Sequence, residues 1–340
     1  MNHIHDCKPP LLVDELDIAG LPGGRIGRLM LKLVHDDFGW PLRLPILVAR
    51  GAQPGKTLGL IAAVHGNEVN GIPVIHKLFA QLDPRRLRGT LIAVVVMNVP
   101  GFHVQQREFS DGVDLNDIMP GKLNGNASEV YVRNFVDQVV RHCDYLVDLH
   151  TASVGRHNSL YLRADLLDPV TAQMAYFLRP PILLHNPPAD GTLRGTAQDI
   201  GIPAITLEIG NPQRFQPQFI RQALAGLGAV LIHTGLMPGR PAKVGAPPLI
   251  CERSHWMYTD FGGLLEVYPD VMETVRAGEL IASLTNIHGD KLRDYRAPED
   301  AVVIGKSVNP VSPTGARIAH LGIVSRPGSP LLKAATRRAS

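Results

Sequence analysis

Apolar runs alternate with stretches of helical periodicity through the middle of the chain. Residues 58–64 and 90–97 are apolar runs, and 145–150 is a third run interrupted by Asp148 and ended by His150. Such runs are typical of strands that are buried on both faces. Between the first two runs, the apolar residues of 69–82 recur every three or four positions, as on one face of a helix. The alternation of strands and helices continues to residue 235. It predicts an α/β protein with a mostly parallel or mixed sheet and helices on both faces.

The same two patterns predict the remaining elements of this region. Residues 102–127 have little periodicity, and a loop of this length in a compact domain usually has a function. The helix that follows is expected to begin at Ser128, because serine often caps a helix N-terminus. The further strands expected are 160–162, 182–185 and 202–210, and the helices are 128–142, 169–178, 195–200 and 216–234.

The two ends of the chain have a different pattern. Residues 26–50 contain two segments that alternate apolar and polar positions, which predicts two edge strands or a hairpin. From residue 248 the apolar runs are short and separated by turn residues, which predicts a small all-β domain. We therefore expect a main domain over 1–240, a β-barrel-like domain over 248–328 and a frayed tail over 329–340.

Composition and charge argue against several classes of protein. The 340 residues are 45% hydrophobic and 19% charged, which is ordinary for a globular protein. The net charge of +3 is too small, and its Lys and Arg too scattered, to indicate nucleic-acid binding. We find no apolar run of about 18 residues, no signal-peptide pattern and no regular cysteine spacing. We expect a soluble cytoplasmic protein that binds neither nucleic acid nor membrane.

Three of the predicted strands end in a side chain that can bind a metal or carry a proton. His65 and Glu68 follow the first strand, His150 ends a second, and a third carries Glu208. Open α/β sheets usually bind ligands at the carboxyl ends of their strands. Two imidazoles and a carboxylate are a ligand set that leaves one position of a catalytic zinc site open. A His-x-x-Glu pair alone is common on solvated helix faces, but a third candidate ligand at the end of another predicted strand, His150, favours a metal site.

Seven short motifs follow one another along residues 58–235, and the chain resembles a known family through them. They are His65-Gly66-Asn67-Glu68, Asn98-Val99-Pro100-Gly101, Arg107, Asp111-Gly112-Val113-Asp114-Leu115-Asn116, Pro120-Gly121, Asp148-Leu149-His150 and Thr206-Leu207-Glu208. In order and context they resemble the succinylglutamate desuccinylase/aspartoacylase family of zinc carboxypeptidase-like deacylases. The predicted β domain is similar to the carboxy-terminal barrel of the same family.

The resemblance implies a zinc centre with one ion per chain. Its ligands would be His65, Glu68 and His150, and the ion would lower the pKa of a bound water towards about 7. Asp114 corresponds to the carboxylate that orients the first zinc histidine.

The resemblance also implies a zinc-dependent amidohydrolase. It would release the acyl group of a small N-acylated amino acid or amine by attack of zinc hydroxide on the amide carbonyl. Glu208 corresponds to the general base, which returns the proton to the leaving nitrogen. Arg107 corresponds to the arginine that polarises the scissile carbonyl.

One position departs from the family pattern. Asn116 corresponds to an asparagine that contacts the substrate, and an arginine that binds a substrate carboxylate usually follows it. This chain has Asp117 instead. Either the substrate carries an amine or guanidinium that pairs with Asp117, or another arginine binds the carboxylate. Arg194 is the best candidate for that role, ahead of Arg156 and Arg163.

Two other functions stay open at this point. The chain could be a carboxypeptidase-like metallopeptidase for short or unusual peptides, although the missing arginine after Asn116 argues against ordinary carboxy-terminal recognition. It could also be a catalytically idle metal-containing binding protein, although Glu208 and Arg107 argue against this because a binder needs no base. The β domain would either narrow the mouth of the cleft or support a homo-oligomer.

Overall fold

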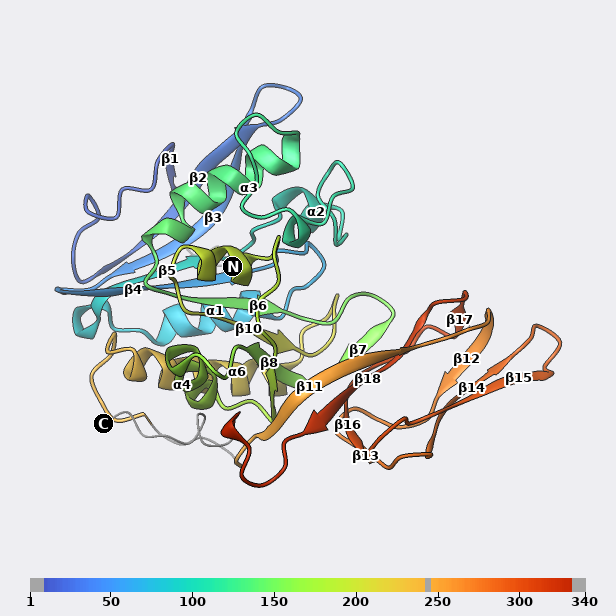
Figure 1. Cartoon of the computed structure of the whole chain (residues 1–340). Helices are drawn as coiled ribbons and strands as arrows, with labels where there is room; N and C mark the ends of the chain where they lie inside the picture. The colour runs from blue at the N-terminus through green and yellow to red at the C-terminus, as the bar shows by residue number, and fades with distance from the viewer. Residues whose placement is uncertain (1–8, 242–245, 332–340) are drawn as a thin grey trace, which may run out of the picture.

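One large mixed sheet with helices on both faces organises the molecule, as the computed structural model shows (Figure 1). The structure describes residues 9–241 and 246–331, so most of the expected frayed tail at 329–340 lies outside the described residues. In spatial order the strands are β1 (Leu11–Val13), β2 (Arg25–His35), β3 (Pro41–Arg50), β5 (Arg88–Val94), β4 (Gln53–Ala62), β6 (Tyr145–His150), β10 (Ala204–Ile209), β8 (Leu160–Ala164), β9 (Ile182–His185), β11 (Leu249–Tyr258), β18 (Arg317–Val324), β16 (Ala301–Ser307) and β13 (Thr274–Val275), and β7 (Arg156–Asn158) pairs with β16. The predicted fold class is confirmed.

The centre of the sheet is parallel. Strand β4 pairs in parallel with β5 and β6, and β6 pairs in parallel with β10. Their carboxyl ends therefore lie at one edge, and Glu208 of β10 is in register with His150 of β6. The three strand ends singled out in the sequence thus come together in the fold.

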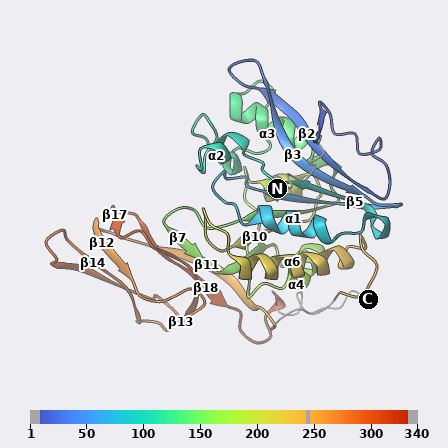
Figure 2. The ribbon, with the colours of Figure 1, turned by 180° about the vertical axis from the view of Figure 1, so that it is seen from behind.

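Helices cover both faces of this parallel centre. On one face lie α1 (Gly71–Gln81), α4 (Pro169–Leu178) and α6 (Pro217–His233); on the other lie α3 (Ala127–Gln138) and α5 (Leu193–Asp199). Figure 2 shows α1 and α6 side by side on the first face. Strand β4 supplies both cores because successive side chains point to opposite faces. Leu58 and Leu60 pack with α1, α4 and α6, whereas Ile61 packs with α3.

Most predicted elements occur close to their expected positions. The segment 26–50 is the antiparallel hairpin β2–β3, but neither strand is an edge strand, because β1 pairs with β2 and β5 pairs with β3. Within the long loop lie the short helix α2 (Val99–His103) and the 3-10 helix η2 (Leu115–Asp117). Two further 3-10 helices, η1 (Pro84–Arg86) and η3 (Val140–His142), complete the helical elements described. No described helix has both the length and the hydropathy that a membrane span needs.

The predicted start of α3 was wrong by two residues. Asn126, rather than Ser128, is the N-cap: its Oδ1 accepts a hydrogen bond from the Glu129 amide at 3.0 Å. The Glu129 carboxylate in turn accepts from the Asn126 amide at 3.1 Å, which completes a capping box. The Ser128 hydroxyl donates to Asn126 Oδ1 at 2.9 Å, and the Ser128 amide donates to Asp111 Oδ2 at 3.3 Å. The glutamate three residues after Asn126 is the sequence signal that distinguishes the two candidates.

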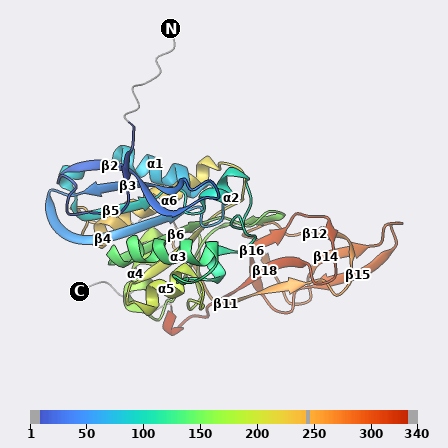
Figure 3. The same ribbon diagram turned by 90° about the horizontal axis from the view of Figure 1, so that it is seen from above.

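The C-terminal strands form two layers. Strand β11 joins the main sheet by parallel pairing with β9, and β18, β16 and β13 follow it. The other layer is an antiparallel sheet in the order β15 (Lys291–Arg296), β14 (Leu280–Thr285), β12 (Gly263–Val267) and β17 (Val311–Ser312). Figure 3 shows this second sheet beyond β18, far from the helices. The two layers share an apolar core that includes Leu284 and Leu321, so the segment is all-β as expected, while its exact domain boundaries stay a prediction.

We expect Asn126→Ala to lower the free energy of unfolding by about 1 kcal/mol, because it removes the N-cap acceptor of α3. Ser128→Ala should cost less, since it leaves the cap in place. Urea unfolding of both variants measures the difference. Equal losses, or a larger loss for Ser128→Ala, would contradict the assignment of the cap.

Candidate metal centre

A tight turn after β4 carries His65 and Glu68. The Glu68 amide donates to the His65 carbonyl at 3.1 Å, which closes the turn. Gly66 lies between them, against the middle of α2, and a Cβ at this position would collide with the backbone of Gly101 and Phe102. Only glycine therefore lets this turn approach α2 so closely. The turn directs the imidazole and the carboxylate towards the end of β6.

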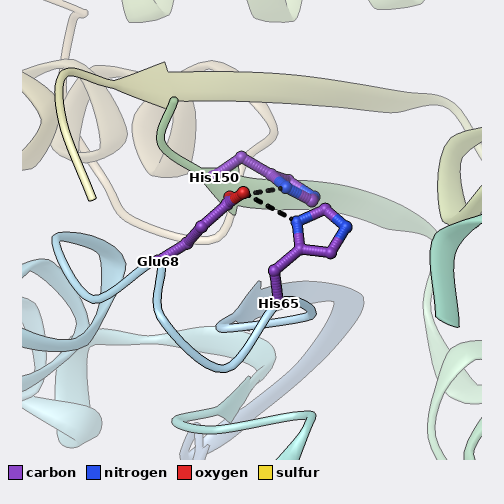
Figure 4. A group of neighbouring side chains, drawn as sticks. All are labelled: His65, Glu68 and His150. Carbon is purple, nitrogen blue, oxygen red and sulfur yellow. Dashed lines mark hydrogen bonds and ion pairs between the residues drawn. The ribbon is translucent and has the colours of Figure 1, made fainter. Parts of the chain in front are cut away.

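Two imidazoles converge on one carboxylate at this edge of the sheet (Figure 4). His65 Nδ1 lies 2.9 Å from Glu68 Oε1, and His150 Nδ1 lies 3.0 Å from Glu68 Oε2. The three side chains are only 1–4% exposed, and their candidate ligand atoms all lie within 4.8 Å of one another. The structure thus brings together the three residues that the sequence nominated as metal ligands.

The outer nitrogen of each imidazole faces a second carboxylate. His65 Nε2 lies 3.1 Å from Asp114 Oδ1, and His150 Nε2 lies 2.6 Å from Asp148 Oδ2. An imidazole that donates from Nε2 presents the lone pair of Nδ1 on its other side. Among the described residues, His65 Nδ1 has no hydrogen-bond partner in good geometry, although Glu68 lies close to it. Lone pairs that face a carboxylate in this way fit a cation between them, and two nitrogens with one oxygen suit zinc.

The electrostatics of the group favour positive charge at the imidazoles. Burial opposes a charge on His150, but the carboxylates of Asp148 and Glu68 outweigh it and raise the pKa of His150 well above its usual value. Burial likewise opposes ionisation of Glu68, but the two imidazoles outweigh it and hold the pKa of Glu68 well below its usual value. The site therefore stabilises an ionised Glu68 together with a cation, whether proton or metal.

Arg107 joins the group from the loop before η2. Its Nε donates to Asp114 at 2.8 Å, and its Nη1 donates to Glu68 and to the Ser153 hydroxyl, both at 3.0 Å. Its Nη2 makes no hydrogen bond to any residue in the described part of the chain, so donors remain for a ligand. Burial opposes ionisation of Asp114, but the hydrogen bond with His65 and the nearby charges lower the pKa of Asp114.

Glu208 lies in the same cavity, one strand away from His150. Its side chain is 2% exposed, and its carboxylate is paired with Arg163 and lies 3.4 Å from Asn158 Nδ2. A buried, directed carboxylate on the neighbouring strand is suited to proton transfer.

The candidate substrate residues also line this cavity. The Oδ1 of Asn116 accepts from the Leu193 amide at 2.8 Å, which leaves its amide nitrogen available. Arg194 is buried and donates to the carbonyl and the side chain of Asn186 at 2.5 and 2.6 Å. Burial lowers the pKa of Arg194 to about 10. Asp117 is exposed at the cavity, so both explanations for it remain geometrically feasible.

The cavity has a volume of about 600 Å³ and includes residues that sequence reasoning missed. Asp148 could have been found, because it lies two positions before His150 on a strand and therefore on the same face. The C-terminal strands contribute four more residues that have no local sequence signal, namely Ser254, Trp256, Arg317 and His320. The all-β segment thus forms one wall of the cavity.

Comparisons with known proteins agree with this geometry. A family model described as the succinylglutamate desuccinylase/aspartoacylase catalytic domain matches residues 54–234, just over half of the chain. The chain is 24% identical to N-alpha-acetyl-L-2,4-diaminobutyric acid deacetylase of Halomonas elongata, over 84% of this chain and 87% of that protein.

Solved structures share the fold. The product-bound ectoine utilization protein EutE (DoeB) from Ruegeria pomeroyi has a TM-score of 0.80 and 23% identity, over 89% of this chain and 98% of that chain. A succinylglutamate desuccinylase from Silicibacter sp. TM1040 has a TM-score of 0.78 and 24% identity, over 88% and 95%. At this identity the likeness shows the fold alone.

We expect Gly66→Ala to reduce bound divalent metal several-fold, because the added methyl group forces His65 and Glu68 apart from their present turn. Gly228→Ala is the control, since nothing lies within 4 Å of a Cβ there. Elemental analysis of dialysed protein gives the metal content, and far-UV circular dichroism checks folding. Full metal content in folded Gly66→Ala would contradict the role of this turn.

Proposed function

The chain belongs to the succinylglutamate desuccinylase/aspartoacylase family, and from that premise we propose that it is a zinc-dependent deacylase. It hydrolyses the amide bond of a small N-acylated amino acid or amine, with one zinc ion per chain held by His65, Glu68 and His150. The observation that carries the proposal is the convergence of two Nδ1 atoms on the buried Glu68 carboxylate, with Glu208 on the next strand. Cysteines without regular spacing favour a reducing, cytoplasmic location.

In the proposed reaction, Glu208 transfers the proton that zinc-activated water releases. Zinc, when bound, supplies the Lewis acidity that makes water a nucleophile at neutral pH. Glu208 accepts the proton that this water loses as its oxygen bonds to the amide carbon. Glu208 then delivers that proton to the leaving nitrogen as the carbon–nitrogen bond breaks, so the products are a carboxylic acid and an amine, which ionise to a carboxylate and an ammonium group.

Arg107 stabilises the negative charge that develops on the carbonyl oxygen. Its Nε and Nη1 are held by Asp114, Glu68 and Ser153, so the guanidinium is fixed before substrate binds. A donor that is already oriented needs no reorganisation as the charge develops. Asp114 and Asp148 orient the two imidazoles through Nε2.

Opposite charges at the cavity suggest a substrate with both an acid and an amine. The Halomonas relative is named for N-alpha-acetyl-L-2,4-diaminobutyric acid, a compound whose name states one acylated amine, one further amine and one acid. In this chain Arg194 would bind the carboxylate and Asp117 the amine. The two explanations for Asp117 are then compatible with each other.

We expect Glu208→Gln to keep its zinc and to lose turnover by about 10²- to 10⁴-fold, because the amide cannot accept the proton of water. The measurement is amine release from a panel of acylated amines and amino acids, with and without chelator. Glu266→Gln, an exposed glutamate of β12, is the matched control. Turnover that survives in Glu208→Gln would rule out this base, and no turnover by the zinc-loaded native protein would favour an idle binding protein.

We expect Asp117→Arg to shift substrate preference about tenfold towards acyl-amino acids that have a free carboxylate and no side-chain amine. The reason is that a guanidinium makes a bidentate pair of hydrogen bonds with a carboxylate. The ratio of kcat/KM for acyl-amino acids with and without that amine reports the shift. Asp37 is an exposed aspartate in the turn of the β2–β3 hairpin, and Asp37→Arg controls for the change of net charge. An unchanged ratio would remove Asp117 from the specificity of the enzyme.

A further inference from the structure

Two arginines of the cavity lack any hydrogen-bond or ion-pair partner among the described residues, whereas Arg194, which also has no carboxylate partner, donates to Asn186. Arg156, at the start of β7, and Arg317, at the start of β18, both line the cavity. Neither guanidinium makes a hydrogen bond or ion pair with any residue in 9–241 or 246–331. Arg107 and Arg163 differ from them, because each faces a carboxylate of the site.

The acidic residues of the cavity cannot compensate these two charges. Glu68 and Asp114 are shared between imidazoles and Arg107, and Asp148 is engaged by His150. The Glu208 carboxylate is paired with Arg163, as described above. Asp117 also lines the cavity, but it makes no ion pair with Arg156 or Arg317. Positive charge is therefore left over on the wall that the C-terminal strands form.

Trp256 of β11 holds the two guanidinium groups in place. The Cζ atoms of Arg156 and Arg317 lie 5.7 and 5.1 Å from the centre of its ring. The ring is itself fixed by His320 of β18, which stacks on it at 4.9 Å with an interplanar angle of 9°. An aromatic face attracts a guanidinium without neutralising its charge or occupying all of its donors. The arrangement positions two cations side by side and leaves their N–H groups for a ligand.

The pKa values of Arg156 and His320 reflect this excess of positive charge. Burial lowers the pKa of Arg156, and the charges of Arg317 and Arg107 lower it further, while Glu68 and Glu208 oppose the shift. Burial, followed by nearby cationic side chains that include Arg163, Arg317 and Arg156, lowers the pKa of His320 to about 3. His320 is therefore neutral and adds no charge of its own, but the potential in this part of the cavity attracts anions.

We propose that Arg156 and Arg317, held on Trp256, form an anion subsite that binds a carboxylate of the substrate remote from the amide that is cleaved. The proposal rests on the proposed function for its reaction, and it narrows the substrate class to N-acyl compounds with a carboxylate that reaches this wall. That carboxylate belongs either to the acyl half, as in a dicarboxylic monoacyl group, or to the amine half, where the two arginines would take the place proposed above for Arg194. The C-terminal strands thereby take part in choosing the substrate.

The first test is a comparison of four amides: N-acetyl and N-succinyl derivatives of one alkylamine and of one amino acid. Arg317→Met should lower kcat/KM by about 10- to 100-fold for the substrates whose carboxylate it binds, mainly through KM. The acetylated alkylamine, which has no carboxylate, should be unaffected. A loss confined to succinyl substrates assigns the subsite to the acyl half, and a loss confined to amino-acid substrates assigns it to the amine half.

Arg293→Met is the matched control. Arg293 also lies over an aromatic ring, 5.1 Å from the centre of Phe261, but it pairs with Asp260 and does not line the cavity. We expect it to change none of the four rates. Equal losses of Arg317→Met on all four amides, or no loss on any, would overturn the subsite while leaving the deacylase intact.

A binding measurement keeps the subsite testable even if none of the four amides is hydrolysed. The chain has two tryptophans, Trp40 and Trp256, so Trp40→Phe makes Trp256 the sole tryptophan reporter. Titration with succinate should change its fluorescence saturably, whereas the neutral succinamide should not. The double variants with Arg317→Met and with Arg156→Met should lose the response, and the one with Arg293→Met should keep it. No response to succinate in folded Trp40→Phe would overturn the proposal, and a response without hydrolysis would overturn only the deacylase.

Discussion

The buried carboxylate of Glu68 is the constraint on which the rest of the site depends. A carboxylate that is about 1% exposed loses its hydration, a penalty of several kcal/mol that only nearby positive charge and hydrogen bonds can offset. Two imidazoles, the Arg107 guanidinium and the Thr151 amide all point at its two oxygens. These groups come from three segments, namely the turn after β4, the long loop and the end of β6, so the charge of one side chain determines where these segments must meet.

The parallel centre of the sheet makes that meeting possible. Parallel strands end at one edge, which places the turn after β4 beside the end of β6 and the end of β6 beside Glu208 of β10. The outer carboxylates of Asp114 and Asp148 then fix the two imidazole rings from behind. His65, Glu68 and His150 are only 1–4% exposed, and burial strengthens each of these interactions.

The C-terminal strands add a wall of different character to the same cavity. The residues proposed for chemistry lie on the parallel centre and its loops, where they are tightly paired. The residues of β11 and β18 at the cavity are an aromatic ring, an uncharged imidazole and a guanidinium without a carboxylate partner. Pairing of β11 with β9 makes this wall a continuation of the main sheet rather than an attached lobe. The residues of the reaction centre and those of the binding wall can therefore change independently in sequence. Their relative position is set by the strand pairing.

What the sequence determined by itself was local. The apolar runs and helical periods identified β6, α4 and β9 at their observed bounds, because burial on both faces and helical amphipathicity leave a direct pattern in the residues. The metal-ligand candidates were also predictable, because His150 ends one strand and His65 and Glu68 lie in the turn that follows another. The cap of α3 was misassigned where two capping residues compete within three positions.

Only the tertiary structure decided the contacts between distant segments. Trp256, Arg317 and His320 carry no local signal, since their position at the cavity comes from the pairing of β11 with β9 and with β18. The same holds for the pairing of Glu208 with Arg163. Side-chain periodicity shows which face of an element is buried, but not which other element covers that face. The charges that meet across a cavity depend on which elements pack together, so they could not be predicted from the sequence.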